Sequence, residues 1–187
     1  MDAKTDRRIA KTQNAIQSAF LEMLLKEGFD AITVKDITER ANISRKTFYL
    51  HYMDKFDLLN AIVIQHLGEL EAICELKKEM DFIDGTIVWF RYFEKNKSFF
   101  AALFASESTV SFHHRLLQFI MEQLSRHLNE HNCKNTAVLQ KFMGMAVLGV
   151  VESYVLNQFN DSVEVIAAQV GELLEQMIRQ NQELPER

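Results

Sequence analysis

The 187-residue chain contains a single proline, Pro185, and only six glycines. Because proline and glycine are the usual breakers of helices, their scarcity predicts a protein built from long helices. Two cysteines, Cys74 and Cys133, are too few for a disulfide framework and predict reduced thiols in a cytoplasmic protein. No run of about 18 apolar residues is free of charge, so no membrane span is expected. The N-terminal stretch also lacks the apolar core of a signal peptide.

The net charge of −5 gives the chain no general affinity for nucleic acid, but the charge is unevenly distributed. Residues 1–53 contain nine Lys or Arg against seven Asp or Glu, whereas residues 54–187 contain twelve against nineteen. The basic residues of the first part gather in two places: Lys4, Arg7, Arg8 and Lys11, then Arg45 and Lys46. This distribution predicts that the N-terminal part binds phosphates locally while the acidic remainder limits indiscriminate binding.

Hydrophobic spacing and capping residues predict four helices in the N-terminal part. Their expected ranges are 9–28, 34–41, 45–52 and 55–76. Thr33, with Asp36 three residues later, is the expected cap of the second helix, while Ser44 and Asp54 are the expected caps of the third and fourth. A tight turn is expected at Asn42, since asparagine tolerates left-handed backbone. Two short helices joined by a tight turn, after a longer helix, are typical of a helix-turn-helix.

The second short helix of such a unit lies in the DNA major groove, with its first residues toward the base edges. The residues expected at that start are Arg45, Lys46 and Thr47, and those expected to reach phosphates are Tyr49, His51 and Lys55. Phe48 and Tyr52 lie one turn apart and are expected to anchor the helix to its own core. An ordinary surface helix does not explain why long polar side chains alternate here with aromatic ones. The pattern therefore favours double-stranded DNA as a partner.

Beyond about residue 80 the chain is rich in aromatic residues. Helices are predicted over 82–95, 97–105, 109–131, 135–159 and 162–181. The aromatic residues form either plain core or the lining of a ligand pocket. The pocket candidates are Trp89, Phe90, Phe93, Phe100, Phe104, Phe119, Phe142 and Tyr154. We expect a DNA-binding domain over 1–54, a connecting helix over 55–77, and a sensing and dimerisation domain over 78–187.

The last two predicted helices carry small residues at positions that permit close packing. The candidate interface consists of Gly144, Val147, Val151, Ala167, Val170, Gly171 and Leu174. These residues pack either within one chain or in a four-helix interface between two copies. We favour the interface, because a palindromic DNA site requires two reading helices about 34–36 Å apart.

Over its first sixty residues the chain resembles the TetR family of transcriptional regulators. The matching positions are Thr12, Ile16, Ala19, Phe20, Gly28, Phe29, Thr33, Val34, Ile37, Ala41, Ile43, Ser44 and the run TFYLHYMDKFDLL from Thr47 to Leu59. Thr38 and Asn42 stand where the family usually has alanine and glycine. The resemblance implies an all-helical dimer with a C-terminal ligand-binding part, and it adds Thr33 to the DNA contacts. The C-terminal part looks more loosely like the subgroup related to the dihydroxyacetone-kinase activator.

Together these patterns predict an all-α, homodimeric, ligand-responsive repressor of a palindromic operator, with an unknown small-molecule effector and no cofactor. Two alternatives stay open. One is a co-activator that works through a protein partner. The other is a metal-responsive repressor that uses His127 and His131, although two histidines fall short of the usual four ligands and no metal site is predicted. An enzyme is not expected, because the sequence has no glycine-rich phosphate loop, nucleophile elbow or metal-hydrolase signature.

Overall fold

The computed structural model describes residues 3–130, 133 and 136–182, with side chains from residue 7 onward. Two residues considered above, Lys4 of the basic N-terminal stretch and His131 of the histidine pair, lie outside the described side chains. Every element named in the described ranges is a helix, which confirms the all-α prediction.

Four helices make up the N-terminal part of the chain. They are α1 (Ala3–Glu27), α2 (Val34–Arg40), α3 (Arg45–Tyr49) and α4 (Lys55–Leu76). Gly28 ends α1 in the left-handed conformation, with φ of 76°, and its N–H donates to the carbonyl of Leu24. Helices α2 and α4 agree with the expected ranges to within one residue, and α1 begins six residues earlier than expected. The reading helix α3 is shorter than expected, because the backbone turns at Leu50 and His51.

The remaining elements form the C-terminal part. They are η1 (Lys77–Glu79), α5 (Phe82–Lys95), α6 (Lys97–Phe104), η2 (Glu107–Thr109), α7 (Val110–Glu130), α8 (Ala137–Val155) and α9 (Val163–Gln180). Helix α8 ends four residues earlier than expected, and Asn157 just beyond it has a φ of 59°. A residue in this left-handed conformation cannot continue a right-handed helix.

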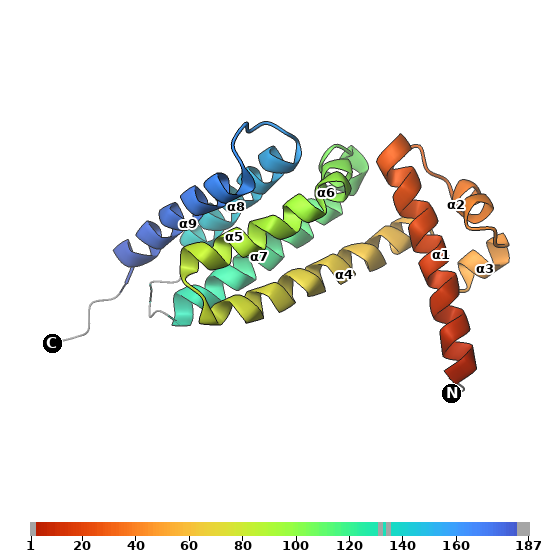
Figure 1. Cartoon of the computed structure of the whole chain (residues 1–187), viewed down its shortest axis with the longest axis horizontal. Helices are drawn as coiled ribbons and strands as arrows, with labels where there is room; N and C mark the ends of the chain where they lie inside the picture. Colours follow the sequence, from red (N-terminus) through yellow and green to blue (C-terminus); the bar gives the residue numbers. More distant parts are fainter. Residues whose placement is uncertain (1–2, 131–132, 134–135, 183–187) are drawn as a thin grey trace.

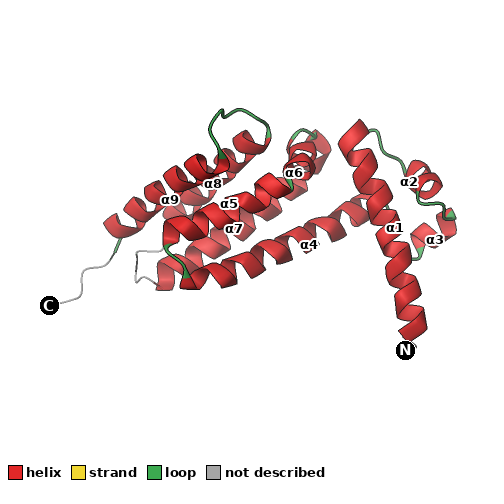
Figure 2. Cartoon of the chain, in the orientation of Figure 1, coloured by secondary structure: helices red, strands yellow, loops and turns green. Residues whose placement is uncertain are grey.

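Figure 1 shows α2 and α3 at one end of the molecule and α8 and α9 at the other. The most extensive helix pairs are α5 with α9 and α7 with α8, which together form a bundle. Helix α4 runs from the helix-turn-helix to this bundle, where it contacts α5 and α7. A short loop joins α3 to α4, and α4 then runs without a break to the bundle (Figure 2).

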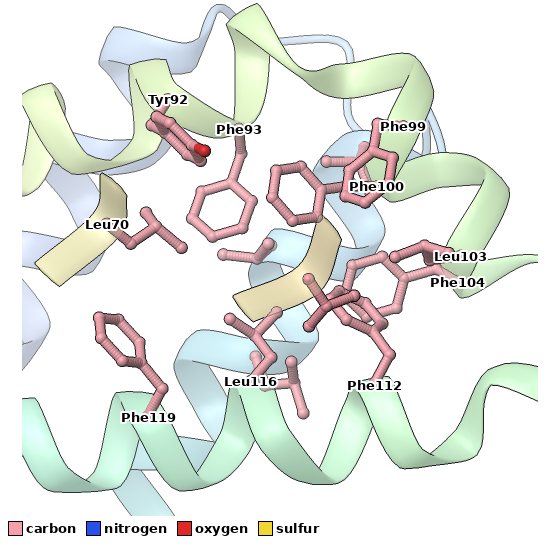
Figure 3. Close-up of a cluster of buried hydrophobic side chains, with 14 of the residues drawn as sticks. Leu70, Tyr92, Phe93, Phe99, Phe100, Leu103, Phe104, Phe112, Leu116 and Phe119 are labelled. Carbon is pink, nitrogen blue, oxygen red and sulfur yellow. The ribbon is translucent and has the colours of Figure 1, made fainter. Parts of the chain in front are cut away.

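Aromatic side chains fill the core of the bundle (Figure 3). Phe93 packs on Phe100 with ring centroids 4.7 Å apart, and Phe104 meets Phe112 edge-on at 5.2 Å. Four residues predicted to line a pocket are instead buried here: Phe93, Phe100, Phe104 and Phe119. Each of these four rings is surrounded by other core side chains, which favours the plain-core alternative.

The residues predicted to form the dimer interface are also buried within the single chain, which favours the alternative that they pack within one copy. All seven are buried: Gly144, Val147, Val151, Ala167, Val170, Gly171 and Leu174. A Cβ added at Gly144 would lie 2.7 Å from Met121 Cγ of α7, and one added at Gly171 would lie 3.2 Å from the backbone of Ile83 in α5. The small residues therefore allow close helix packing inside the bundle rather than between copies.

Candidate DNA-binding surface and effector cavity

The start of α2 is held by a reciprocal cap. The Thr33 hydroxyl accepts the Asp36 N–H at 3.3 Å, and the Asp36 carboxylate accepts the Thr33 N–H at 3.1 Å. Hydrogen bonds from Thr33 lower the pKa of Asp36 from its usual value. The predicted capping box is confirmed. Thr33 itself is exposed beside the reading helix, so it remains a candidate phosphate contact.

The turn and the cap of α3 also follow the sequence. Asn42 has a φ of 52°, and the Ser44 hydroxyl accepts the Thr47 N–H at 3.0 Å. Phe48 is fully buried and Tyr52 nearly so, which fixes one side of α3 against the N-terminal core. Because that side is fixed, the opposite side of the helix must face solvent.

The exposed face of α3 carries unpaired positive charge. Arg45 and Lys46 are exposed, and neither forms an ion pair with any carboxylate in the part of the chain that the structure describes. Arg40, at the end of α2, is different, because it pairs with Glu22 of α1 and holds the pKa of that carboxyl at about 2. Two free cations therefore lie on the reading helix itself, where they could bind a phosphate or a guanine.

Two apolar residues on the same surface were missed by the sequence reasoning. Leu50 is 74% exposed and Met53 is 79% exposed, next to Tyr49 at 57%. Apolar side chains on a DNA-reading surface can contact thymine methyl groups. The available signal was that Leu50 and Met53 lie out of phase with the buried pair Phe48 and Tyr52.

Lys55 has a different role from the one predicted. Its ammonium donates to the carbonyls of Phe29, Asp30 and Ile32 at 3.0, 3.3 and 2.8 Å. It also lies 4.6 Å from the centroid of the Phe29 ring. A lysine has three N–H donors, so these carbonyls saturate the group. In this structure Lys55 ties the start of α4 to the loop after α1, and it has no donor left for a phosphate.

The same loop also contacts the C-terminal bundle. The Ser106 hydroxyl, between α6 and η2, donates to Asp30 at 2.9 Å. Hydrogen bonds from Ser108 and Ser106 lower the pKa of Asp30. Helix α6 also packs against α1. The helix-turn-helix is therefore joined to the bundle at this loop as well as through α4.

A cavity of about 680 Å³ lies between the far end of α4 and helices α5, α7, α8 and α9. Its lining consists of Cys74, Lys77, Lys78, Met80, Asp81, Phe82, Gly85, Thr86, Trp89, Phe90, Ile120, Gln123, Leu124, Arg126, His127, Glu130, Val147, Val170, Leu174, Glu175, Ile178, Arg179 and Gln182. The volume is within the range of about 300–1,000 Å³ typical of small-molecule sites.

Two family models match the chain. The model for bacterial regulatory proteins of the tetR family matches residues 16–62, and a model for the C-terminal region of transcriptional regulators, TetR_C_8, matches residues 81–176. The second match alone covers more than half of the chain. The chain belongs to the TetR family. It is therefore a DNA-binding transcriptional regulator and not an enzyme.

Individual relatives of this TetR-family regulator match in part. The HTH-type transcriptional regulator YxbF of Bacillus subtilis (strain 168) is 40% identical over 70 residues, which cover 37% of this chain and 18% of that protein. The dhaKLM operon transcriptional activator DhaS of Lactococcus lactis subsp. lactis (strain IL1403) is 27% identical over 108 residues, 58% of this chain and 56% of that protein. The chain thus spans less than two thirds of either relative.

Among solved structures, a TetR transcriptional regulator from Streptococcus agalactiae 2603V superposes with a TM-score of 0.71. The alignment covers 91% of this chain and 97% of that chain at 21% sequence identity. At this identity the likeness shows the fold alone.

The aromatic residues predicted to line an effector pocket have several different environments in the TetR-family fold. Trp89 and Phe90 line the cavity. Phe142 is 63% exposed. It lies on the outer side of α8, whereas Met143 and Val147 lie on the side of that helix that is buried in the bundle. Tyr154 is buried away from the cavity, where its hydroxyl donates to Glu94 at 3.1 Å. Phe142 and Tyr154 are thus not among the residues that line this cavity.

Of the histidine pair considered as a metal site, His131 lies outside the described residues. The His127 ring packs on Phe82 at the cavity, with ring centroids 4.7 Å apart. Within residues 3–130, 133 and 136–182 no three His, Cys, Asp or Glu side chains come together as metal ligands.

Proposed function

We propose that this TetR-family regulator is a homodimeric, ligand-responsive repressor of a palindromic DNA operator. The observation that carries the proposal is the free positive charge of Arg45 and Lys46 on a capped, rigidly anchored reading helix. Arg45 is the proposed base contact, since its guanidinium can pair with both acceptors of a guanine. Thr33, Lys46, Thr47, Tyr49 and His51 are the proposed supporting contacts.

The second copy is proposed to pack on the outer face of α8 and α9. This face exposes large apolar side chains: Val138 (79%), Phe142 (63%), Met145 (49%), Val165 (44%) and Leu173 (62%). Val138, Phe142 and Met145 line one shallow surface hollow on α8, and soluble monomers seldom leave a large apolar patch in water. Two helices from each copy would form a four-helix interface and place the two reading helices in register with successive major grooves.

Among the helices in the part of the chain that the structure describes, α8 is long and apolar enough to be a candidate membrane span by length and composition, which is weak evidence. One side of it is buried in the bundle through Met143, Val147 and Val151. We therefore assign its outer apolar face to the dimer and place the protein in the cytoplasm, where its DNA is.

Helix α4 is the proposed link between effector and DNA. Its first residue, Lys55, is bonded to the loop after α1, and its last turn supplies Cys74 to the cavity. With 22 residues it spans about 33 Å. The protein is proposed to exchange between a state whose reading helices fit the operator and a state whose reading helices are wrongly separated. A ligand that binds the second state more tightly lowers operator affinity by the ratio of its affinities for the two states. The proposed domains, 1–54 and 78–187, are joined by this helix.

A second candidate function is activation rather than repression. The specific observation in its favour is the relative DhaS, which is named as a transcriptional activator and is similar over 58% of this chain. A reporter gene placed behind the selected operator separates the two: expression rises on deleting the regulator if it represses, and falls if it activates.

The test of the proposal is selection of bound fragments from a random DNA library at fixed, near-physiological salt. We expect enrichment of a two-fold symmetric site with half-sites one helical turn apart. On the selected site Arg45→Ala should weaken binding and relax the base preference, whereas Arg91→Ala, whose guanidinium pairs with Glu164 on the bundle, should leave it unchanged. No enrichment, or enrichment of a single asymmetric half-site, would contradict the proposal.

A further inference from the structure

Lys77 is the one cation of the effector cavity that has no partner among the described residues. It caps the C-terminus of α4, is half-buried, and lines the cavity. The other lysine and arginine side chains of the lining are paired: Lys78 with Glu75 at 2.7 Å, Arg126 with Glu71 at 3.2 Å and Arg179 with Glu175 at 2.9 Å. Lys77 therefore differs from the other lysine and arginine residues of the lining in having no carboxylate partner within the described part of the chain.

The position of the Lys77 side chain is set by a glycine on α5. A Cβ added at Gly85 would lie 3.2 Å from Lys77 Cβ and 3.3 Å from its Cδ. The absence of a side chain at Gly85 lets the aliphatic stem of Lys77 cross α5 in close contact. The stem of Lys77 is thereby held against α5, at the lining of the cavity.

An unpaired ammonium in this environment is unfavourable for the empty protein. Burial lowers the pKa of Lys77 from its ordinary value. The thiol of Cys74 is the titratable group that interacts with Lys77, but burial raises the pKa of that thiol, so it stays neutral and supplies no counter-charge. A charged group that is partly desolvated gains most from a partner that brings the opposite charge.

The rest of the cavity favours an apolar body. Trp89, Phe90, Ile120, Val147 and Leu174 form its inner surface, and none of them offers a charged group. Three carboxylates also line the site: Asp81, Glu130 and Glu175. Asp81 already accepts the N–H of Ile83 at 2.9 Å, and all three would repel a ligand that carries several negative charges.

We propose that the effector is an apolar monocarboxylate, whose chain or ring lies against Trp89 and Phe90 and whose carboxylate accepts a hydrogen bond from Lys77. The inference rests on the proposed sensing function of the cavity and specifies its ligand class. It also gives the ligand a direct contact with the end of α4, since Lys77 is the residue that caps that helix.

The test uses decanoate and decanol as matched probes, because they differ only in the group that Lys77 would bind. Trp89 is the only tryptophan of the chain and lines the cavity, so its fluorescence reports occupancy in the intact protein. Decanoate should bind more tightly than decanol. Lys77→Met, which keeps the length of the stem, should weaken decanoate about ten- to a hundredfold and leave decanol unchanged.

Two control variants make the comparison specific. Lys77→Arg should retain most of the decanoate affinity, and Lys78→Met should have little effect, since Lys78 lines the same cavity but is paired with Glu75. Equal binding of decanoate and decanol, unchanged by Lys77→Met, would overturn the carboxylate inference. Absence of any binding by either probe would overturn it as well. Neither result would touch operator recognition, which the DNA selection measures separately.

Discussion

The contacts of Lys55 make a prediction that separates a structural lysine from a DNA-binding one. Lys55→Met keeps the hydrocarbon stem and removes only the ammonium. The three carbonyls that it bonds lie at 2.8–3.3 Å in the loop after α1. Without the ammonium, this loop loses its hydrogen bonds to the start of α4, so the helix-turn-helix should open more readily.

The size of the effect follows from the number of contacts and their exposure. A hydrogen bond from a charged donor contributes about 1.5–3 kcal/mol when buried. Lys55 is only half-buried, and water can replace the ammonium at the freed carbonyls, so the three bonds together should contribute about 2 kcal/mol rather than their sum. A difference of about 2 kcal/mol corresponds to roughly thirtyfold more frequent local opening.

Amide hydrogen exchange in α2 and α3 is the assay, because it reports opening of this unit rather than of the whole chain. Lys46→Met is the matched control, since Lys46 is exposed on α3 and has no partner among the described residues. The control should exchange at the normal rate but bind DNA more weakly, with a salt dependence smaller by about one phosphate contact. The reasoning would be refuted if Lys55→Met behaved like Lys46→Met, with normal exchange and a reduced salt dependence.

Three further predictions concern other parts of the molecule. Phe142→Asp should convert the proposed dimer into a monomer in sedimentation at micromolar concentration, because it charges the exposed α8 face. Leu25→Asp, at a residue of α1 that is 54% exposed against 63% for Phe142, should not. Burial lowers the pKa of His66, so at mildly acidic pH the unfolded chain binds a proton that the folded chain does not. The free energy of unfolding should therefore fall as the pH drops below about 6.5. His66→Phe should flatten this part of the pH dependence, measured by denaturant unfolding. Ser106→Ala removes the hydrogen bond to Asp30 and should reduce the effect of ligand on operator affinity. The effect is measured as the ratio of the operator binding constants without and with ligand. An unchanged ratio would mean that α4 alone couples the cavity to the DNA-binding surface.

The helix-turn-helix could be predicted closely because its signals are local. A cap, a left-handed turn and an anchor lie within a few residues of each other, so Thr33, Asn42, Ser44 and Phe48 all behave as expected. Lys55 departs from this pattern because its partners are backbone carbonyls more than twenty residues earlier. No spacing rule points from a lysine to a distant carbonyl.

The C-terminal part was harder to predict for the same reason. The helices are apparent from periodicity, but which side of a helix meets which neighbour depends on contacts across the bundle. Gly144 and Gly171 carry a true signal of close packing, yet the partners are α7 and α5 of the same chain rather than a second copy. Phe142 and Phe93 are both phenylalanines within predicted helices. Only the packing of the bundle shows that Phe142 is exposed and Phe93 is buried.

The central claim is that Arg45 of each copy reads a base in a symmetric operator. The measurement that tests it most directly is a double-mutant cycle on the selected site, which combines Arg45→Ala with replacement of the guanine proposed to face it. We predict that each single change weakens binding by about 1–3 kcal/mol, and that the double change weakens it little more than either single change does. Fully additive losses would show that Arg45 and the guanine do not interact, and the proposed orientation of α3 on DNA would then be wrong.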